Sequence, residues 1–193
     1  QPMARIEATS AIPYASPDIV VDPATLEKVR RALVKDVYEG KAGTDTSASM
    51  GTPYDTDPQL HLYATAYGWG GLAIAHAGYV PITRNLTKVE DGKALPSSLT
   101  FTPPEIDEGR GGFWSVITYD AEGWIARDKA SICNSEVAPN ADGSCTIHFN
   151  SPGKANNLDT PAPFVALLRV YVPRSKEGIV RYMASSVWSM PWT

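Results

Sequence analysis

The 193-residue chain lacks several patterns that would assign it to a functional class at once. It has no run of like charges, and its net charge of −4 argues against a nucleic-acid surface, which needs a basic patch. No apolar stretch approaches the roughly 18 residues of a membrane-spanning helix. The Gly-x-Ser-x-Gly nucleophile motif, the His-Glu-x-x-His zinc motif and the phosphate-binding loop are also missing. Sequence motifs therefore fix no reaction, and we expect no cofactor and no bound metal.

Cysteine is scarce as well. The two cysteines, Cys133 and Cys145, flank a turn-rich segment, so a hairpin would bring them together. We predict a disulfide between them, which would contribute roughly 3 kcal/mol by closing a short loop. The alternative is a pair of reduced, half-buried thiols that pack as small hydrophobic side chains.

The location of the protein is expected to be extracellular or periplasmic. A disulfide is typical of such oxidising compartments. Asn85-Leu86-Thr87 is a glycosylation sequon, so we predict a glycan on Asn85. The first residue is Gln1 rather than Met, so either a leader has been removed or the sequence simply starts at this point of a longer chain.

Two helices are predicted near the N-terminus, at about 23–39 and 58–67. In each case an Asp-Pro pair precedes the helix, so Asp22 and Asp57 would cap it and the proline would occupy its first position. Residues 1–21 carry three prolines and no sustained period, and are predicted to form an arm. We expect residues 22–193 to form a single domain.

From residue 79 onward the hydrophobic period changes to two, which is typical of β-strands. Turn sequences rich in Gly, Pro, Asn and Asp separate the segments YVPITRNL, SLTFTPP, FWSVITYD, WIA, SCTIHFN and FVALLRVYVP. Two helices followed by six or seven such strands predict a mainly β fold, an antiparallel sandwich or jelly roll with helices at one side.

The segment FWSVITYD (113–120) shows the alternation most clearly. Phe113, Ser115, Ile117 and Tyr119 would point to one face of the strand, and the residues between them to the other. The following Ala-Glu-Gly favours a tight turn into Trp124. This segment is therefore interpreted first as part of a hairpin.

Three separated motifs resemble, in order, those of domain-of-unknown-function family 1214. They are FWSVITYDAEGW (113–124), NADGSCTIHF (140–149) and NNLDTPAPFVALLRVYVP (156–173), and the resemblance extends over roughly residues 60–173. It implies a β-sandwich of jelly-roll character and a domain that commonly follows another uncharacterised domain, family 1254. It implies no reaction.

This chain departs from the family pattern at three places. Cys145 stands where relatives usually have Leu, and Leu158 where they usually have Trp. The segment 124–142 is shorter than usual and lacks an Asn-Arg pair. A site built from those groups is not expected here.

The three histidines do not stand at metal-ligand spacing. His61 is expected on the polar side of its helix, and His76 to be half-buried and hydrogen-bonded. His148 alternates with Ile147 and Phe149, which places its ring on the opposite face, toward solvent or a cleft.

Arg169 is the most informative residue, because it is the one charge in the apolar strand FVALLRVYV. A buried arginine needs a partner, since an unpaired buried charge costs several kcal/mol. One interpretation is a structural clamp in which Arg169 pairs with Asp120. The other is an anchor for an anion or carboxylate in a pocket lined by Trp114, Tyr119 and Tyr171.

Two classes of function follow from these observations. The first is a secreted binding or self-assembly module, with the N-terminal arm or the tryptophans of the C-terminal segment (Trp188 and Trp192) lying on a neighbouring copy. Its ligand would be small and polar, or a carbohydrate. The second is a hydrolase or isomerase with a small polar site around Arg169, Asp120 and Tyr119, joined by His148.

Overall fold

Three helices are present in the part of the chain that the computed structural model describes, namely residues 21–43, 45–68, 70–82, 89–125 and 127–185. Helix α1 spans Pro23–Tyr38, α2 spans Pro58–Tyr67 and α3 spans Lys176–Met183. The two predicted N-terminal helices are confirmed. Helix α3 was not predicted from the sequence. No helix within these residues is both long and apolar enough to cross a bilayer.

Aspartates start the two N-terminal helices, as the Asp-Pro pairs predict. The Asp22 carboxylate accepts hydrogen bonds from the backbone N–H groups of Ala24 and Thr25. Asp57 does the same at the start of α2. These bonds satisfy helix-end donors that have no partner within the helix.

The strands form three small sheets that are mainly antiparallel. The first has the order β1-β9-β5-β6, the second β2-β3 and the third β4-β7-β8, in which β7 and β8 are parallel. The strand bounds are Ala77–Ile82 (β1), Val89–Glu90 (β2), Lys93–Ala94 (β3), Ser97–Phe101 (β4), Phe113–Asp120 (β5), Ser131–Cys133 (β6), Cys145–Phe149 (β7), Asn157–Leu158 (β8) and Phe164–Tyr171 (β9). Among the described strands no barrel closes, and the sandwich or jelly-roll arrangement stays a prediction.

Strand β9 lies at the centre of the first sheet and divides its two faces. Phe164, Ala166, Leu168 and Val170 are buried, whereas the residues between them are partly exposed. The buried residues join side chains of the third sheet, such as Ile147, in one hydrophobic core. The partly exposed face of the first sheet points away from this core.

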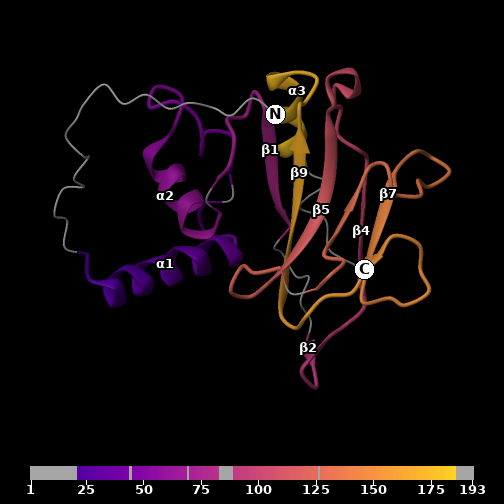
Figure 1. Ribbon diagram of the computed structural model, residues 1–193, viewed down its shortest axis with the longest axis horizontal. Helices are drawn as coiled ribbons and strands as arrows, with labels where there is room; N and C mark the ends of the chain where they lie inside the picture. The colour runs from indigo at the N-terminus through magenta and orange to yellow at the C-terminus, as the bar shows by residue number, and fades with distance from the viewer. Residues whose placement is uncertain (1–20, 44, 69, 83–88, 126, 186–193) are drawn as a thin grey trace, which may run out of the picture.

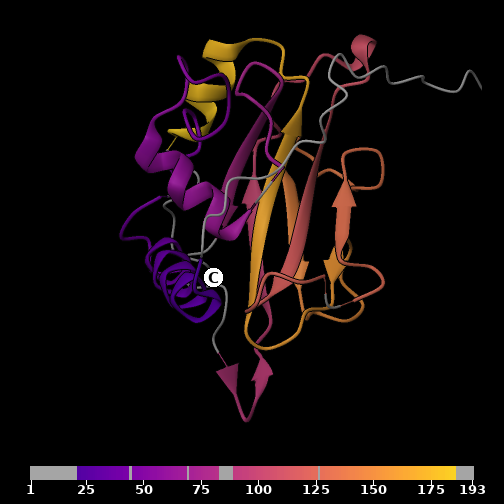
Figure 2. The same cartoon turned by 60° about the vertical axis from the view of Figure 1, so that its left-hand side comes forward.

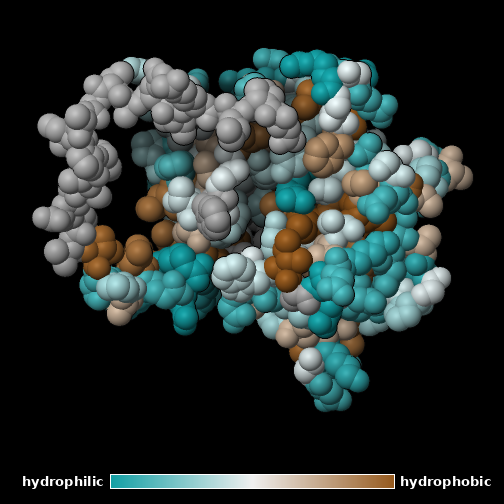
Figure 3. Space-filling model, viewed as in Figure 1, coloured by the Kyte–Doolittle hydropathy of each residue, from teal (hydrophilic) through white to brown (hydrophobic). Residues whose placement is uncertain are grey.

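Helices α1 and α2 lie on that other side of the first sheet, and β7 lies on the core side (Figure 2). We call α1, α2 and the loop residues 45–57, 68 and 70–72 the helical layer. In Figure 3, hydrophobic residues gather in the middle of the visible face, beside this layer. The partly exposed face of the sheet and the helical layer therefore border a common space.

The segment after β5 is a turn rather than the start of a new strand. The backbone N–H of Gly123 donates to the carbonyl of Asp120, and that of Asp120 donates to the carbonyl of Trp124. Trp124 and Ile125 belong to no strand and are 71% and 60% exposed. The strand predicted at 124–126 is therefore wrong for its two described residues.

The predicted disulfide is wrong. Cys133 lies on β6 in the first sheet, opposite Ser115, whereas Cys145 lies on β7 in the third sheet, opposite Phe101. Cys145 points into the core, but Cys133 lies on the other face, where its Sγ contacts Ser135 and Glu136. The extracellular location loses the support that a disulfide would have given it.

Labelling of the native protein with a thiol reagent is expected to modify Cys133 alone. Cys145 is 4% exposed, and burial raises the pKa of its thiol, so it should react only after unfolding. The measurement is mass spectrometry before and after denaturation, with Cys133→Ser as a control that should take up no label when native. A cross-linked pair under non-reducing conditions would contradict this.

Candidate functional site

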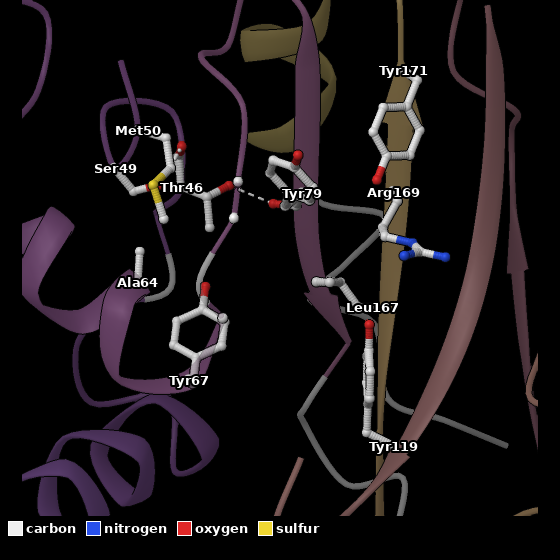
Figure 4. A pocket seen from close by; sticks show the side chains of 13 residues that line it. Thr46, Ser49, Met50, Ala64, Tyr67, Tyr79, Tyr119, Leu167, Arg169 and Tyr171 are labelled. Atoms are coloured by element: carbon white, nitrogen blue, oxygen red, sulfur yellow. Dashed lines mark hydrogen bonds between the residues drawn. The ribbon is translucent and has the colours of Figure 1, made fainter. Parts of the chain in front are cut away.

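A pocket of about 150 Å³ lies between the partly exposed face of the first sheet and the helical layer (Figure 4). The sheet contributes Tyr79 from β1, Tyr119 from β5, and Leu167, Arg169 and Tyr171 from β9. The helical layer contributes its other wall, and the described lining residues there are Thr46, Ser49, Met50, Ala64, Tyr67, Gly68, Gly70 and Gly71. The pocket is thus built from segments far apart in the sequence.

The strand register explains why these sheet residues meet. On neighbouring strands, Tyr79 and Ser115 both lie opposite Arg169. Tyr171 lies two residues further along β9 and therefore shares the face of Arg169. Tyr119 reaches the same face from β5, as the alternation of that strand predicts.

Arg169 has no hydrogen bond and no ion pair within the described residues. It lines the pocket, and its Nε is sealed from solvent without an acceptor. The buried Ser115 hydroxyl, directly across from it on β5, also lacks a partner. Buried polar atoms in folded proteins are nearly always satisfied, so such atoms call for a water, an ion or a ligand.

The predicted clamp between Arg169 and Asp120 is wrong. Asp120 lies opposite Phe164, five residues along β5 from Ser115, which corresponds to roughly 16 Å. Its Oδ1 instead accepts hydrogen bonds from the backbone N–H groups of Glu122 and Trp124, at 3.0 and 2.8 Å. Asp120 therefore stabilises the turn after β5 and leaves the guanidinium without a carboxylate.

Tyrosine rings surround the guanidinium. The Tyr79 hydroxyl accepts a hydrogen bond from the backbone N–H of Leu72 at 3.0 Å, which ties the sheet to the helical layer. The rings of Tyr79 and Tyr171 meet edge to face at 6.3 Å, and Phe113 stacks on Tyr171 at 4.7 Å. These contacts hold the rings in place before a ligand binds. Ligand binding would therefore cost little side-chain entropy.

The tyrosine hydroxyls keep their protons well above neutral pH. Burial raises the pKa of Tyr79 and of Tyr119, although the positive charge of Arg169 partly opposes this in both. The two hydroxyls are therefore hydrogen-bond donors or acceptors at physiological pH rather than anions.

The helical wall is held by its own hydrogen bonds. The Thr46 hydroxyl donates to the backbone carbonyl of Tyr79, and the Ser49 hydroxyl donates to that of Thr46 at 3.0 Å. The His61 ring bonds the Ser49 carbonyl through Nδ1 at 2.8 Å, so His61 supports this loop. His61 is not among the described lining residues.

The remaining predicted site residues lie elsewhere. Trp114 faces the core, where it is 3% exposed and meets Phe101 edge to face at 5.3 Å. His148 lies on the outer face of the third sheet, opposite Ser98. His76 is exposed rather than half-buried. Asn85 and the terminal segments fall outside the described residues.

The structure thus brings together three of the six residues proposed as ligand-binding: Arg169, Tyr119 and Tyr171. It adds Tyr79, Tyr67 and the helical wall, which the sequence interpretation did not include. Tyr79 alternates with buried neighbours in the same way as Arg169, but its strand partner was not predictable from the local pattern. Within the described residues, no group of three His, Cys, Asp or Glu side chains is placed to hold a metal ion.

Comparisons with known proteins support the fold and the family. A search of curated proteins found no match. Among solved structures, the chain is similar to the crystal structure of the VPA0106 protein from Vibrio parahaemolyticus, with a TM-score of 0.51 and 23% identity. The similarity covers 83% of this chain and 45% of that one, so this chain spans less than half of the matched protein.

A family model described as "Protein of unknown function (DUF1214)" matches residues 87–175. This range includes the three motifs noted in the sequence, together with Tyr119, Arg169 and Tyr171, whereas Tyr79 and the helical wall precede it. The chain therefore carries a domain of the DUF1214 family over residues 87–175.

Proposed function

We propose that this domain binds a small organic anion in the pocket between the first sheet and the helical layer. The observation that carries the proposal is Arg169, whose guanidinium lines the pocket while its buried Nε has no acceptor among the described residues. A partly buried cation is expensive unless it is paired, and an anionic ligand would supply the pair.

The surroundings of Arg169 favour a carboxylate as that anion. A guanidinium presents its N–H donors in a planar fork that matches the two oxygens of a carboxylate. The Tyr119 hydroxyl reaches the same space and has no hydrogen-bond partner in the described chain, so it can donate to the same group (Figure 4). Ligand binding is thus favoured over a purely structural role for the arginine.

Benzoate is expected to bind the full chain at least tenfold more tightly than benzamide, its neutral analogue of similar size. A charge-assisted hydrogen bond contributes roughly 1.5–3 kcal/mol, and every 1.4 kcal/mol corresponds to a factor of ten. Isothermal titration calorimetry measures both affinities. Equal affinity for the two compounds, or no binding of either, would overturn the proposal.

Two further proposals concern self-assembly and catalysis. Self-assembly through residues 1–21 or through Trp188 and Trp192 concerns segments outside the described residues. Enzymatic conversion of the bound acid is the alternative to simple binding, and NMR of the recovered acid after long incubation distinguishes the two.

A further inference from the structure

We infer that the ligand is a monocarboxylate with a compact apolar body, and that Met50 sets how long this body can be. The inference rests on the proposed binding of an anion at Arg169. It adds the orientation of the ligand, its polarity and its size.

The two walls of the pocket differ in polarity. Arg169 and the hydroxyls of Tyr119 and Tyr171 gather on the sheet side, whereas Met50 and Ala64 face them from the helical layer (Figure 4). The lining glycines of the helical layer, Gly68, Gly70 and Gly71, add no polar side chain. A carboxylate on the sheet side would therefore direct the rest of the ligand toward an apolar surface.

The described part of the helical wall carries three hydroxyls, those of Thr46, Ser49 and Tyr67, and the first two are already committed as donors. Thr46 and Ser49 each donate their proton to a backbone carbonyl, those of Tyr79 and Thr46 respectively. Neither of these two hydroxyls can donate to a second anionic group, and burying a charged group without donors is unfavourable. A second carboxylate beside Thr46 and Ser49 is therefore unfavourable, which selects against dicarboxylates.

The volume limits the ligand. A cavity of 150 Å³ holds a molecule of about benzene size, so a pocket of this volume takes roughly six to nine non-hydrogen atoms. Straight-chain acids of about five to seven carbons, and benzoate, fall in this range.

Met50 packs against Gly71 in the helical wall of the pocket. A Cβ atom added to Gly71 would lie 2.8 Å from Cγ of Met50, so glycine at this position lets the methionine lie against the backbone. Met50 itself lines the pocket. A methionine side chain is flexible and apolar, and truncating it would extend the space available to the ligand.

The test is a calorimetric series of straight-chain acids from acetate to decanoate on the 193-residue chain. We expect affinity to rise with length up to about five to seven carbons and then to fall. Adipate, which matches hexanoate in carbon number, is expected to bind at least about tenfold more weakly. Replacing Met50 with alanine should move the optimum to acids longer by about two carbons.

Leu62→Ala is the matched control, because Leu62 is an exposed apolar residue of the same layer outside the described lining. It should leave the length optimum unchanged. Adipate binding as tightly as hexanoate, or an optimum unmoved by Met50→Ala, would overturn this inference while leaving anion binding intact. Failure of every acid to bind would instead overturn the proposed function itself.

Discussion

Replacing Arg169 with methionine is expected to abolish the binding of small carboxylates while leaving the free energy of unfolding unchanged or higher. Methionine keeps much of the length of arginine but removes the guanidinium that would pair with the ligand. Truncating one partner of a buried charge pair costs about 2–5 kcal/mol, so affinity should fall by about thirtyfold or more. Isothermal titration calorimetry with benzoate measures this affinity.

Stability is expected to respond differently because the guanidinium has no partner to lose within the described chain. Its Nε is buried without an acceptor, so removing it relieves a desolvation cost instead of breaking a bond. Urea unfolding should show a change of less than about 0.5 kcal/mol, or an increase. A loss of several kcal/mol with benzoate binding preserved would show that the arginine is structural.

Two further variants isolate the cause. Arg174→Met removes an exposed arginine outside the pocket lining and should change neither affinity nor stability. Asp120→Asn keeps the Oδ1 that accepts from the turn, and its effect should add to that of Arg169→Met without coupling. Strong energetic coupling between the two substitutions would instead indicate that Arg169 and Asp120 interact, as in the clamp interpretation.

The elements that the sequence predicts well are those with local causes. Asp22 and Asp57 start their helices through bonds to residues two and three positions away, so the pattern is readable from a few neighbouring letters. The two faces of β5 follow the period of two: Ser115 and Tyr119 share the face of Arg169, whereas Trp114 lies in the core on the other face. The missed helix α3 also has a local signal, since the Ser175 hydroxyl accepts from the backbone N–H of Gly178.

The errors arise where strand order and register decide the outcome. Arg169 was paired with Asp120 as the available carboxylate, but the register places Asp120 opposite Phe164. Cys133 and Cys145 are near in sequence, yet their strands belong to different sheets. Most of the pocket lining comes from residues that were not proposed from the sequence, such as Tyr79, which pairs with Arg169 across 90 positions of chain. No local pattern encodes such a pairing.

Leu168 and Leu167 are neighbours on β9, and their replacement by alanine is expected to separate stability from binding. Leu168 is 0% exposed in the core, whereas Leu167 is partly exposed and lines the pocket. Leu168→Ala should lower the free energy of unfolding by about 3–5 kcal/mol, because the cavity it leaves cannot collapse fully. In the protein that remains folded, hexanoate affinity should stay within about twofold.

Leu167→Ala should have the opposite effect. Its side chain faces the pocket, so truncation should cost about 1 kcal/mol of stability or less, while removing apolar contact with the ligand weakens hexanoate binding by about tenfold. Urea unfolding and calorimetry below the unfolding midpoint measure the two quantities, and Leu168→Val provides a milder core change if the alanine variant does not fold. Equal losses of stability at the two positions, with hexanoate affinity spared at Leu167, would mean that this face of β9 supports packing and not a ligand.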